Sequence, residues 1–318
     1  MTSSFPAPAP SSLLLSSLAL SAGSLVALDF DGTLALISPH PEDARPVPGA
    51  DRVLRAIRAT GAALAVVSGR SVESLLRISG FADLPGIVIY GTHGAERWQA
   101  GVLRAGPAPP GLADLRHRLP GLVAGAVREP EVWIENKSLS LVVHARLTPD
   151  PDRVLEVLRG PVEKAAAAAG LAVRPGKEVL EICLPGIDKG TALRELLDDR
   201  VTDALYAGDD VGDLEAMAEV RAWARRSGRP GWTVAVGSAD GPLAGAAAEV
   251  TVPDPGALLG LLAGLLLAGS GLWVRGGGQG QDRGADGVID DGQDLGFGPL
   301  GAVVPLGERA YAGQPDLG

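Results

Sequence analysis

The segment LVALDFDGTLALI, Leu25 to Ile37, combines a buried strand with acidic and glycine residues. Residues 25–30 are largely apolar, a pattern typical of a parallel strand that is covered on both faces. Asp29, Asp31 and Gly32 lie where such a strand ends. Because ligands of open α/β sheets bind beyond the carboxyl ends of the strands, the segment predicts a site at this position.

Helical and strand patterns alternate on both sides of a central interruption. Before it, the sequence predicts helices at 50–60 and 72–78 and strands at 62–67 and 86–90. After it, we expect helices at 190–198 and 214–224, a strand at 204–207 and a last strand at 233–236. This alternation predicts an α/β fold with a doubly wound parallel sheet, the core of a Rossmann-like domain.

The interruption, which lies between these two parts, differs from them in composition and in its hydrophobic pattern. It contains a Pro/Gly-rich passage, helical patterns at 112–119 and 152–169, and strand patterns at 132–143, 171–173 and 179–184. In 138–143, Leu and Val alternate with Ser, which predicts an antiparallel strand with one solvated face. We therefore expect an inserted α+β cap domain.

The expected parts of the chain are a flexible lead with a short helix at 1–22, the first part of the core at 23–105, the cap at 106–186, the second part of the core at 187–270 and a disordered tail at 271–318. The tail is rich in Gly and Asp and too polar to repay the entropy of ordering. The lead lacks the positive charge of a signal peptide. The apolar run 257–273 is expected to be a core helix rather than a membrane anchor.

Composition limits the classes of partner. The 318 residues carry a formal net charge of -10, which argues against nucleic acid or an anionic membrane surface as the partner. Cys183 is the one cysteine, so an intrachain disulfide is excluded and a reducing cytoplasm is expected. The sequence gives no indication of the oligomeric state.

Polar side chains of four segments are expected at one edge of the sheet. They are Asp29 and Asp31, Ser68, Lys189, and Asp209, Asp210 and Asp213. Carboxylates that face one another require a cation, and hard oxygen ligands suit Mg²⁺. A lysine among them supplies a charge for phosphate. Single residues have structural alternatives, such as a helix N-cap for Asp213 or a turn for Ser68.

These segments resemble, in order and spacing, the four motifs of the haloacid dehalogenase-like phosphatase superfamily. The matching stretches are DFDGT at 29–33, VVSGR at 66–70, DKG at 188–190 and GDDVGD at 208–213. The resemblance implies that Asp29 attacks phosphorus and forms an aspartyl-phosphate, and that Asp31 protonates the leaving oxygen and then helps to activate water. It also implies that Ser68 and Lys189 bind the phosphoryl oxygens.

The same resemblance implies the remaining contacts of the motifs. Mg²⁺ would be held by Asp29, Asp209 and the Asp31 carbonyl, with Asp210 and Asp213 as further metal candidates. The other motif residues expected to contact the substrate are Thr33, Gly69 and Arg70.

Within the superfamily the chain looks most like the trehalose-6-phosphate phosphatases. The similar stretches are LDFDGTLALI at 28–37, YGTHGAE at 90–96, EICLPGIDKG at 181–190 and the spacing of polar residues over 135–146. The resemblance implies a sugar phosphate substrate whose sugar contacts are His93, Glu96, Glu135, Lys137, His144, Arg146 and Glu181. The alternative is that Glu135 and Lys137 are the solvated side of a strand and that His144 is an ordinary surface histidine, and a similar alternative holds for His93 and Glu96.

Two departures from that family leave other functions open. The fourth motif has Gly212-Asp213-Leu214 where the family usually has Thr-Asp-Glu, and Cys183 occupies a usual arginine position. Glucosyl- or mannosyl-glycerate phosphate and sucrose phosphate are alternative substrates. A sugar-phosphate sensor without catalysis and a phosphomutase are alternative functions.

Overall fold

The fold is described from a computed structural model, which describes residues 18–38, 40–176, 178–237 and 248–269. All of these residues belong to one compact unit. The tail expected at 271–318 lies outside the described residues, as do residues 1–17 of the lead. Residues 18–22 are irregular, so this described part of the lead does not contain the expected short helix.

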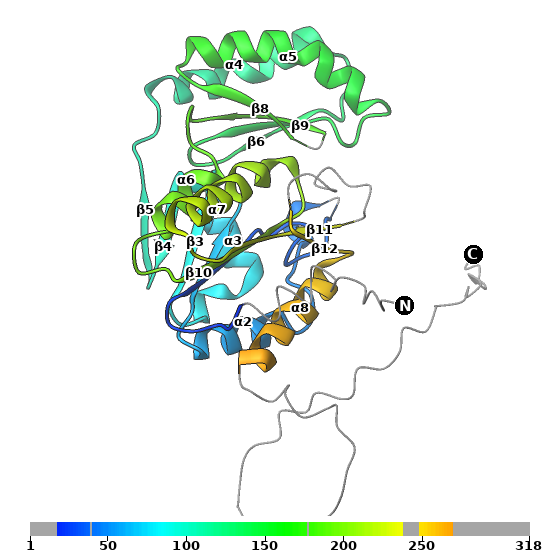
Figure 1. Cartoon of the computed structure of the whole chain (residues 1–318). Helices are drawn as coiled ribbons and strands as arrows, with labels where there is room; N and C mark the ends of the chain where they lie inside the picture. The colour runs from blue at the N-terminus through cyan, green and yellow to red at the C-terminus, as the bar shows by residue number, and fades with distance from the viewer. Residues whose placement is uncertain (1–17, 39, 177, 238–247, 270–318) are drawn as a thin grey trace, which may run out of the picture. The chain divides into compact units, whose positions relative to one another are not determined.

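An eight-stranded sheet forms the core, in the order β12-β11-β10-β1-β2-β3-β4-β5. Its first six strands in this order pair in parallel, and β4 and β5 add an antiparallel hairpin at one edge (Figure 1). The bounds are β1 Ser24–Leu28, β2 Ala63–Val67, β3 Ile87–Gly91, β4 Glu96–Gln99, β5 Val102–Ala105, β10 Asp203–Gly208, β11 Gly231–Val236 and β12 Val250–Val252. The expected doubly wound α/β sheet is confirmed.

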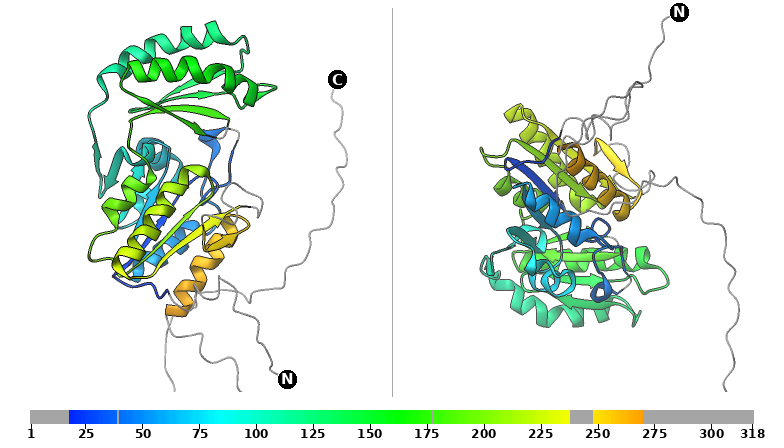
Figure 2. Two further views of the ribbon diagram at one scale, coloured as in Figure 1. Left: turned by 45° about the horizontal axis from the view of Figure 1, so that its top comes forward. Right: turned by 90° about the horizontal axis from the view of Figure 1, so that it is seen from below.

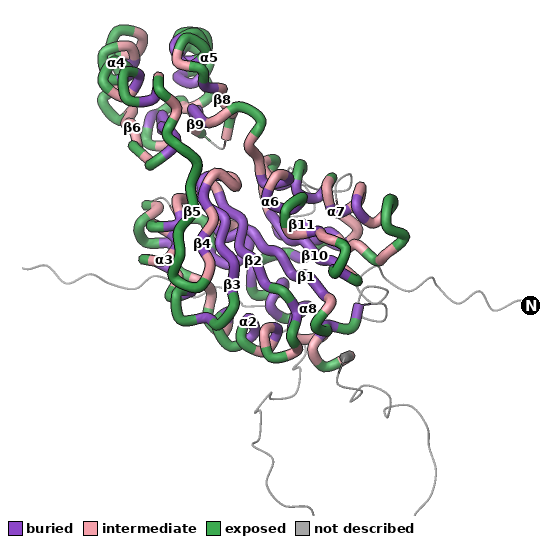
Figure 3. The backbone as a smooth tube through the Cα atoms, turned by 90° about the vertical axis from the view of Figure 1, so that its left-hand side faces the viewer, coloured by how far each residue is buried: buried purple, intermediate pink, exposed green. Residues whose placement is uncertain are grey.

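Helices cover both faces of this sheet, which explains the apolar runs of its central strands. The packed helices are α2 Ala50–Ala59, α3 Val72–Ser79 and α8 Pro255–Gly269 on one face, and α6 Lys189–Leu196 and α7 Leu214–Ser227 on the other (Figure 2). Alternate residues of β1 enter the two cores: Val26 and Leu28 face one, Leu25 and Ala27 the other. The central strands are therefore buried on both sides (Figure 3).

Two features of the core differ from the prediction. The strand at 233–236 is not the last one, because β12 follows it and pairs with β11. The β4–β5 hairpin was not predicted at all. Each of its strands has only four residues, and β5 is exposed along its whole length, so neither carries the apolar run that predicts a strand. In the intervening turn, Ala100 and Gly101 both have positive φ.

The inserted cap is a four-stranded antiparallel sheet, in the order β6-β7-β9-β8, packed on two helices. Its elements are α4 Pro110–Ala126, β6 Trp133–Asn136, β7 Leu141–His144, α5 Pro151–Ala168, β8 Ala172–Gly176 and β9 Val179–Cys183. Leu141 and Val143 of β7 face the helices, where they pack with Leu158 of α5.

The stretch predicted as one strand at 132–143 is a hairpin of two strands, since the chain turns between Asn136 and Leu141. The predicted solvated face of β7 is also wrong, because all four of its residues are buried. On the face away from the helices, the indole of Trp133 stacks on the His144 ring with 3.6 Å between centroids. Among the described residues there is no helix with the length and apolar character needed to span a membrane.

Candidate active site

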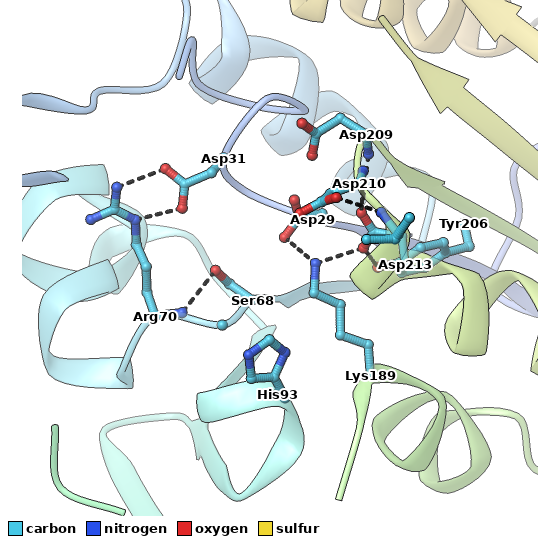
Figure 4. A network of polar contacts seen from close by, with 12 residues as sticks. Asp29, Asp31, Ser68, Arg70, His93, Lys189, Tyr206, Asp209, Asp210 and Asp213 are labelled. Carbon is cyan, nitrogen blue, oxygen red and sulfur yellow. Dashed lines mark hydrogen bonds and ion pairs between the residues drawn. The ribbon is translucent and has the colours of Figure 1, made fainter. Parts of the chain in front are cut away.

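Three strands of the core end and one helix begins at one edge of the sheet, and together they bring the motif side chains there (Figure 4). Asp29 follows β1 and Asp209 follows β10; the Asp29 amide donates to the Ala207 carbonyl, so the parallel pairing continues to this residue. Ser68 follows β2, and Lys189 begins α6, whose N-cap is Asp188. The first-turn position on α6 directs the Lys189 ammonium among the carboxylates.

Lys189 lies between two buried carboxylates. Its Nζ is 2.8 Å from Asp29 Oδ1 and 2.6 Å from Asp213 Oδ1. Burial raises the pKa of Asp29 well above its usual value, although Lys189 opposes the change. Burial lowers the pKa of Lys189, but Asp213 and Asp29 outweigh it and hold that pKa above its ordinary value. The lysine therefore stays a cation beside Asp29.

Asp213 accepts four hydrogen bonds and is fully buried. Lys189 Nζ and the Tyr206 hydroxyl, at 2.6 Å each, donate to Oδ1, and the amides of Asp209 and Asp210, at 3.1 Å each, donate to Oδ2. Asp213 does not cap the following helix α7 through its side chain. Its carboxylate instead orders the loop after β10 and orients Lys189.

Three carboxylates gather where a cation would bind. One oxygen each from Asp29, Asp209 and Asp213 lies within 4.8 Å of the others. Burial, followed by the charge of Asp213, raises the pKa of Asp209 to about 7. Gly32 permits this approach, because a Cβ at this position would lie 2.0 Å from Asp209 Oδ2. Carboxylate oxygens that lie this close together fit a hard cation such as Mg²⁺. Asp213 already accepts four hydrogen bonds, so Asp29 and Asp209 are the carboxylates that would be available to the ion.

Asp31 lies apart from this group. Its carboxylate pairs with Arg70 through two hydrogen bonds of 2.6 and 2.7 Å, and Figure 4 shows it directed away from Lys189. Arg70 also donates to the Pro41 carbonyl at 2.8 Å. Asp210 accepts from the next amide, that of Val211, at 2.6 Å and caps a short 3-10 helix, Val211–Asp213. Neither Asp31 nor Asp210 belongs to the three grouped carboxylates.

The second motif forms the other wall of the site. Ser68 is buried, and its Oγ accepts a hydrogen bond of 3.2 Å from the Arg70 amide. Thr33 is also buried, and its Oγ1 has no hydrogen-bond partner among the described residues. A buried hydroxyl without a partner is uncommon in proteins, so Thr33 fits the expected contact with a ligand.

Several of the expected sugar contacts meet between the cap and the core. Lys137 Nζ donates to the Gly69 carbonyl at 2.9 Å and lies 3.4 Å from Glu181 Oε1. His93 Nε2 lies 2.5 Å from Glu181 Oε2. Burial alone would raise the pKa of Glu181, but Lys137 and His93 reverse this and hold that pKa well below its usual value. Glu181 is therefore an anion.

The other expected sugar contacts have separate surroundings. Glu96 is buried; its carboxylate accepts from the Val72 amide at 2.7 Å and from the Ser138 hydroxyl. His144 Nε2 lies 3.1 Å from Glu135 Oε2, and its Nδ1 has no hydrogen-bond partner in the part of the chain that the structure describes. Burial, with the positive charge of Arg146, lowers the pKa of His144. The structure thus separates Glu96 from the group around Glu181.

Three residues of these networks were missed from the sequence. Tyr206 donates to Asp213 from within an aliphatic strand, Ser138 contacts Glu96, and Trp133 stacks on His144. A tyrosine three residues before an acidic motif is a usable signal, since it is the one aromatic residue of its strand. No pattern in the sequence pointed to Ser138.

The fold and the site define a haloacid dehalogenase-like protein with an inserted α+β cap. The profile of the family described as trehalose-phosphatase matches residues 27–242, and the chain belongs to this family.

Curated relatives agree with this assignment. The trehalose-phosphate phosphatase of Mycobacterium leprae is 33% identical over 219 residues, which are 62% of this chain and 47% of the relative. A probable trehalose-phosphate phosphatase of Sinorhizobium fredii is 32% identical over 248 residues, 76% of this chain and 86% of the relative. The chain thus spans about half the length of the mycobacterial trehalose-phosphate phosphatases that it matches.

Solved structures support the fold. The C-terminal domain of the Candida albicans trehalose-6-phosphate phosphatase aligns with a TM-score of 0.64 at 19% identity, over 83% of this chain and 99% of that domain. A trehalose-6-phosphate phosphatase related protein aligns with a TM-score of 0.61 at 24% identity, over 78% of this chain and 99% of the other.

Proposed function

We propose that this protein is a magnesium-dependent phosphatase that hydrolyses trehalose 6-phosphate to trehalose and phosphate. The observation that carries the proposal is the buried contact of Lys189 with Asp29 beside Asp209. A nucleophile next to a cation and a second carboxylate is what phosphoryl transfer needs, because the transition state is stabilised mainly by positioned charges. Membership of the trehalose-phosphatase family supports the substrate.

In the first step Asp29 attacks phosphorus, the bond from phosphorus to the sugar oxygen breaks, and the phosphoryl group becomes esterified to the Asp29 carboxylate. Lys189 orients Asp29 and neutralises one phosphoryl oxygen, and Ser68 donates a hydrogen bond to another. Mg²⁺ held by Asp29 and Asp209 would supply further positive charge to the phosphoryl group.

Asp31 is the proposed general acid and base. It gives a proton to the leaving sugar oxygen and then takes a proton from the water that attacks the phosphorus of the phosphorylated Asp29. The bond between phosphorus and the Asp29 oxygen breaks, so phosphate leaves and the carboxylate is restored. In this structure Arg70 holds the Asp31 carboxylate with two hydrogen bonds. A phosphate group competes for the same guanidinium, so we expect substrate binding to release Asp31, whose side chain is 37% exposed. The released carboxylate then takes up a proton from solvent and gives it to the leaving oxygen.

The cap is proposed to select the sugar. Glu181 and Lys137 present an anion and a cation close to the phosphate-binding side of the core, and both are good partners for sugar hydroxyls. Glu135, His144 and Arg146 extend this polar region along the cap sheet. We also propose that the enzyme works in the cytoplasm, because its single cysteine requires no oxidising compartment.

A phosphate-release panel tests the proposal. Each protein is incubated with Mg²⁺ and one of four esters: trehalose 6-phosphate, sucrose phosphate, glucosylglycerate phosphate or glucose 6-phosphate. The proteins are the wild type, the Asp29→Asn variant and the control Asp51→Asn, which changes an exposed helix position. We expect rapid release from trehalose 6-phosphate by the wild type and the control, and none by Asp29→Asn.

Different outcomes would correct different parts of the proposal. Release that persists after the Asp29→Asn change would remove Asp29 as the nucleophile. Equal rates with trehalose 6-phosphate and glucose 6-phosphate would remove the specific substrate. No release from any ester would favour the sensor, and conversion to an isomeric sugar phosphate would favour a mutase.

A further inference from the structure

The segment from Gly91 to Glu96, here called the bridge segment, links strands β3 and β4 and has an uncommon backbone. Thr92 and His93 both lie in the left-handed region, with φ of 47° and 56°. Residues other than glycine rarely adopt this conformation, because the Cβ is then too close to the backbone. Two such residues in succession persist only where the surrounding contacts hold them, and such strain occurs most often at functional sites.

One end of the bridge segment is attached to the Ser68–Arg70 loop of the proposed phosphate site. The Thr92 amide donates to the Arg70 carbonyl at 2.7 Å, and the His93 amide donates to the Ser68 carbonyl at 2.9 Å. The His93 ring lies directly on Gly69, since a Cβ there would be 2.8 Å from its Nε2. The imidazole and the left-handed backbone therefore hold the loop in place.

The other end of the bridge segment contacts the cap. His93 Nε2 lies 2.5 Å from Glu181 Oε2 on β9. Glu96 accepts from the Ser138 hydroxyl of the β6–β7 turn with one oxygen and from the amide of Val72, the first residue of α3 just after the loop, with the other. His93 thus contacts both the cap and the phosphate loop, and Glu96 contacts both the cap and the helix that follows the loop.

Lys137 completes the connection, because its Nζ donates to the Gly69 carbonyl from the cap. Gly69 is consequently contacted by His93 on one side and by Lys137 on the other. Three of these groups are largely buried, since the side chains of His93, Glu181 and Lys137 expose 12%, 10% and 13% of their surface, whereas Ser138 is exposed. Hydrogen bonds at this degree of burial restrict the loop more than contacts in water do.

We propose that the bridge segment couples the seating of the cap to the geometry of the phosphate loop, with His93 as the positioning residue. A displaced cap loses Ser138 and Glu181 as partners of Glu96 and His93, and the loop then loses the restraint that holds Ser68 and Gly69. The inference rests on the proposed function, and it assigns His93 to the loop rather than to the sugar.

Binding of orthophosphate tests this coupling without requiring catalysis or a sugar. The full-length protein is titrated with orthophosphate in the presence of Mg²⁺ by calorimetry. Ser138→Ala removes a cap contact of the bridge segment that is remote from the phosphate. His93→Asn keeps a side chain that tolerates the left-handed backbone but is too short to reach Glu181. The matched control is His117→Asn, an exposed position on α4 of the cap.

We expect Ser138→Ala and His93→Asn each to weaken phosphate binding by about fivefold or more, the scale of coupling between linked sites. The double variant should weaken it by less than the product of the two, because both changes break the same connection. His117→Asn should bind phosphate as the wild type does.

Unchanged phosphate affinity in both variants, with a raised KM for the sugar phosphate in His93→Asn, would overturn the proposal and make His93 a sugar ligand. Circular dichroism checks folding, and Ser138→Ala decides the question if His93→Asn does not fold. A wild-type protein that binds phosphate but hydrolyses no ester would remove the proposed function while the coupling is still tested. A wild-type protein that binds no phosphate would overturn both.

Discussion

Replacing Asp209 by asparagine should stabilise the metal-free protein, because this carboxylate is ionised at a site that disfavours its charge. Asp209 lies against Gly32 and beside Asp213 and Asp29, and burial is the main cause that raises its pKa to about 7 from an ordinary 3.8. Asparagine has nearly the same shape and no charge. The change therefore removes the repulsion and leaves the packing in place.

The pKa determines both the size and the pH dependence of the effect. A rise from 3.8 to about 7 corresponds to at most about 4 kcal/mol, at 1.36 kcal/mol for each pKa unit. Between about pH 4 and pH 7 the folded protein binds more protons at Asp209 than the unfolded chain does, so the free energy of unfolding falls as the pH rises. Since water and side-chain adjustment relieve part of the penalty, we expect Asp209→Asn to raise the free energy of unfolding by about 2 kcal/mol above pH 7 and by almost nothing near pH 4.

Urea unfolding of the two proteins in chelator, at about pH 4 and about pH 8, measures this difference. Asp83→Asn, at an exposed position, is the control and should change neither value. Saturating Mg²⁺ should stabilise the wild type and have little effect on Asp209→Asn, because a ligand stabilises only the state that binds it. A variant that is less stable than the wild type at about pH 8 without metal would refute the electrostatic reasoning.

Two further changes probe the same site. Lys189→Met leaves Asp29 and Asp213 buried without their cation. We expect kcat to fall by about 100-fold or more and the free energy of unfolding to fall by about 3–5 kcal/mol. Phosphate release and urea unfolding measure these changes, and Lys164→Met, at an exposed position, is the control. Retention of kcat in Lys189→Met would contradict its place beside the nucleophile. Gly32→Ala places a Cβ 2.0 Å from Asp209 Oδ2, at a residue whose φ is 71°. We expect the activity to fall by about 100-fold and Mg²⁺ binding, measured by calorimetry, to weaken. A variant that binds Mg²⁺ with wild-type affinity would argue against Asp209 as a ligand.

The alternation of apolar runs and helical patterns was sufficient to predict the central sheet, because parallel strands buried on both faces have a distinctive composition. The same signal failed at the edges. Strand β5 is exposed throughout, and the cap hairpin of β6 and β7 reads as one strand, since a short turn between polar residues interrupts the pattern very little. Strand preference depends mainly on packing against neighbouring strands and on burial, so an exposed edge strand and the short strands of a hairpin carry a weak local signal.

By itself, the sequence determined which residue types follow the core strands, and therefore that Asp29, Ser68 and Asp209 meet at one edge. This follows because parallel strands of one sheet end on the same side. Tertiary structure alone decided how these side chains share their partners. It paired Asp31 with Arg70, gave the Asp213 carboxylate four hydrogen-bond donors, and placed His93 and Glu96 in contact with the cap. Such contacts depend on the mutual orientation of elements that are distant in the chain.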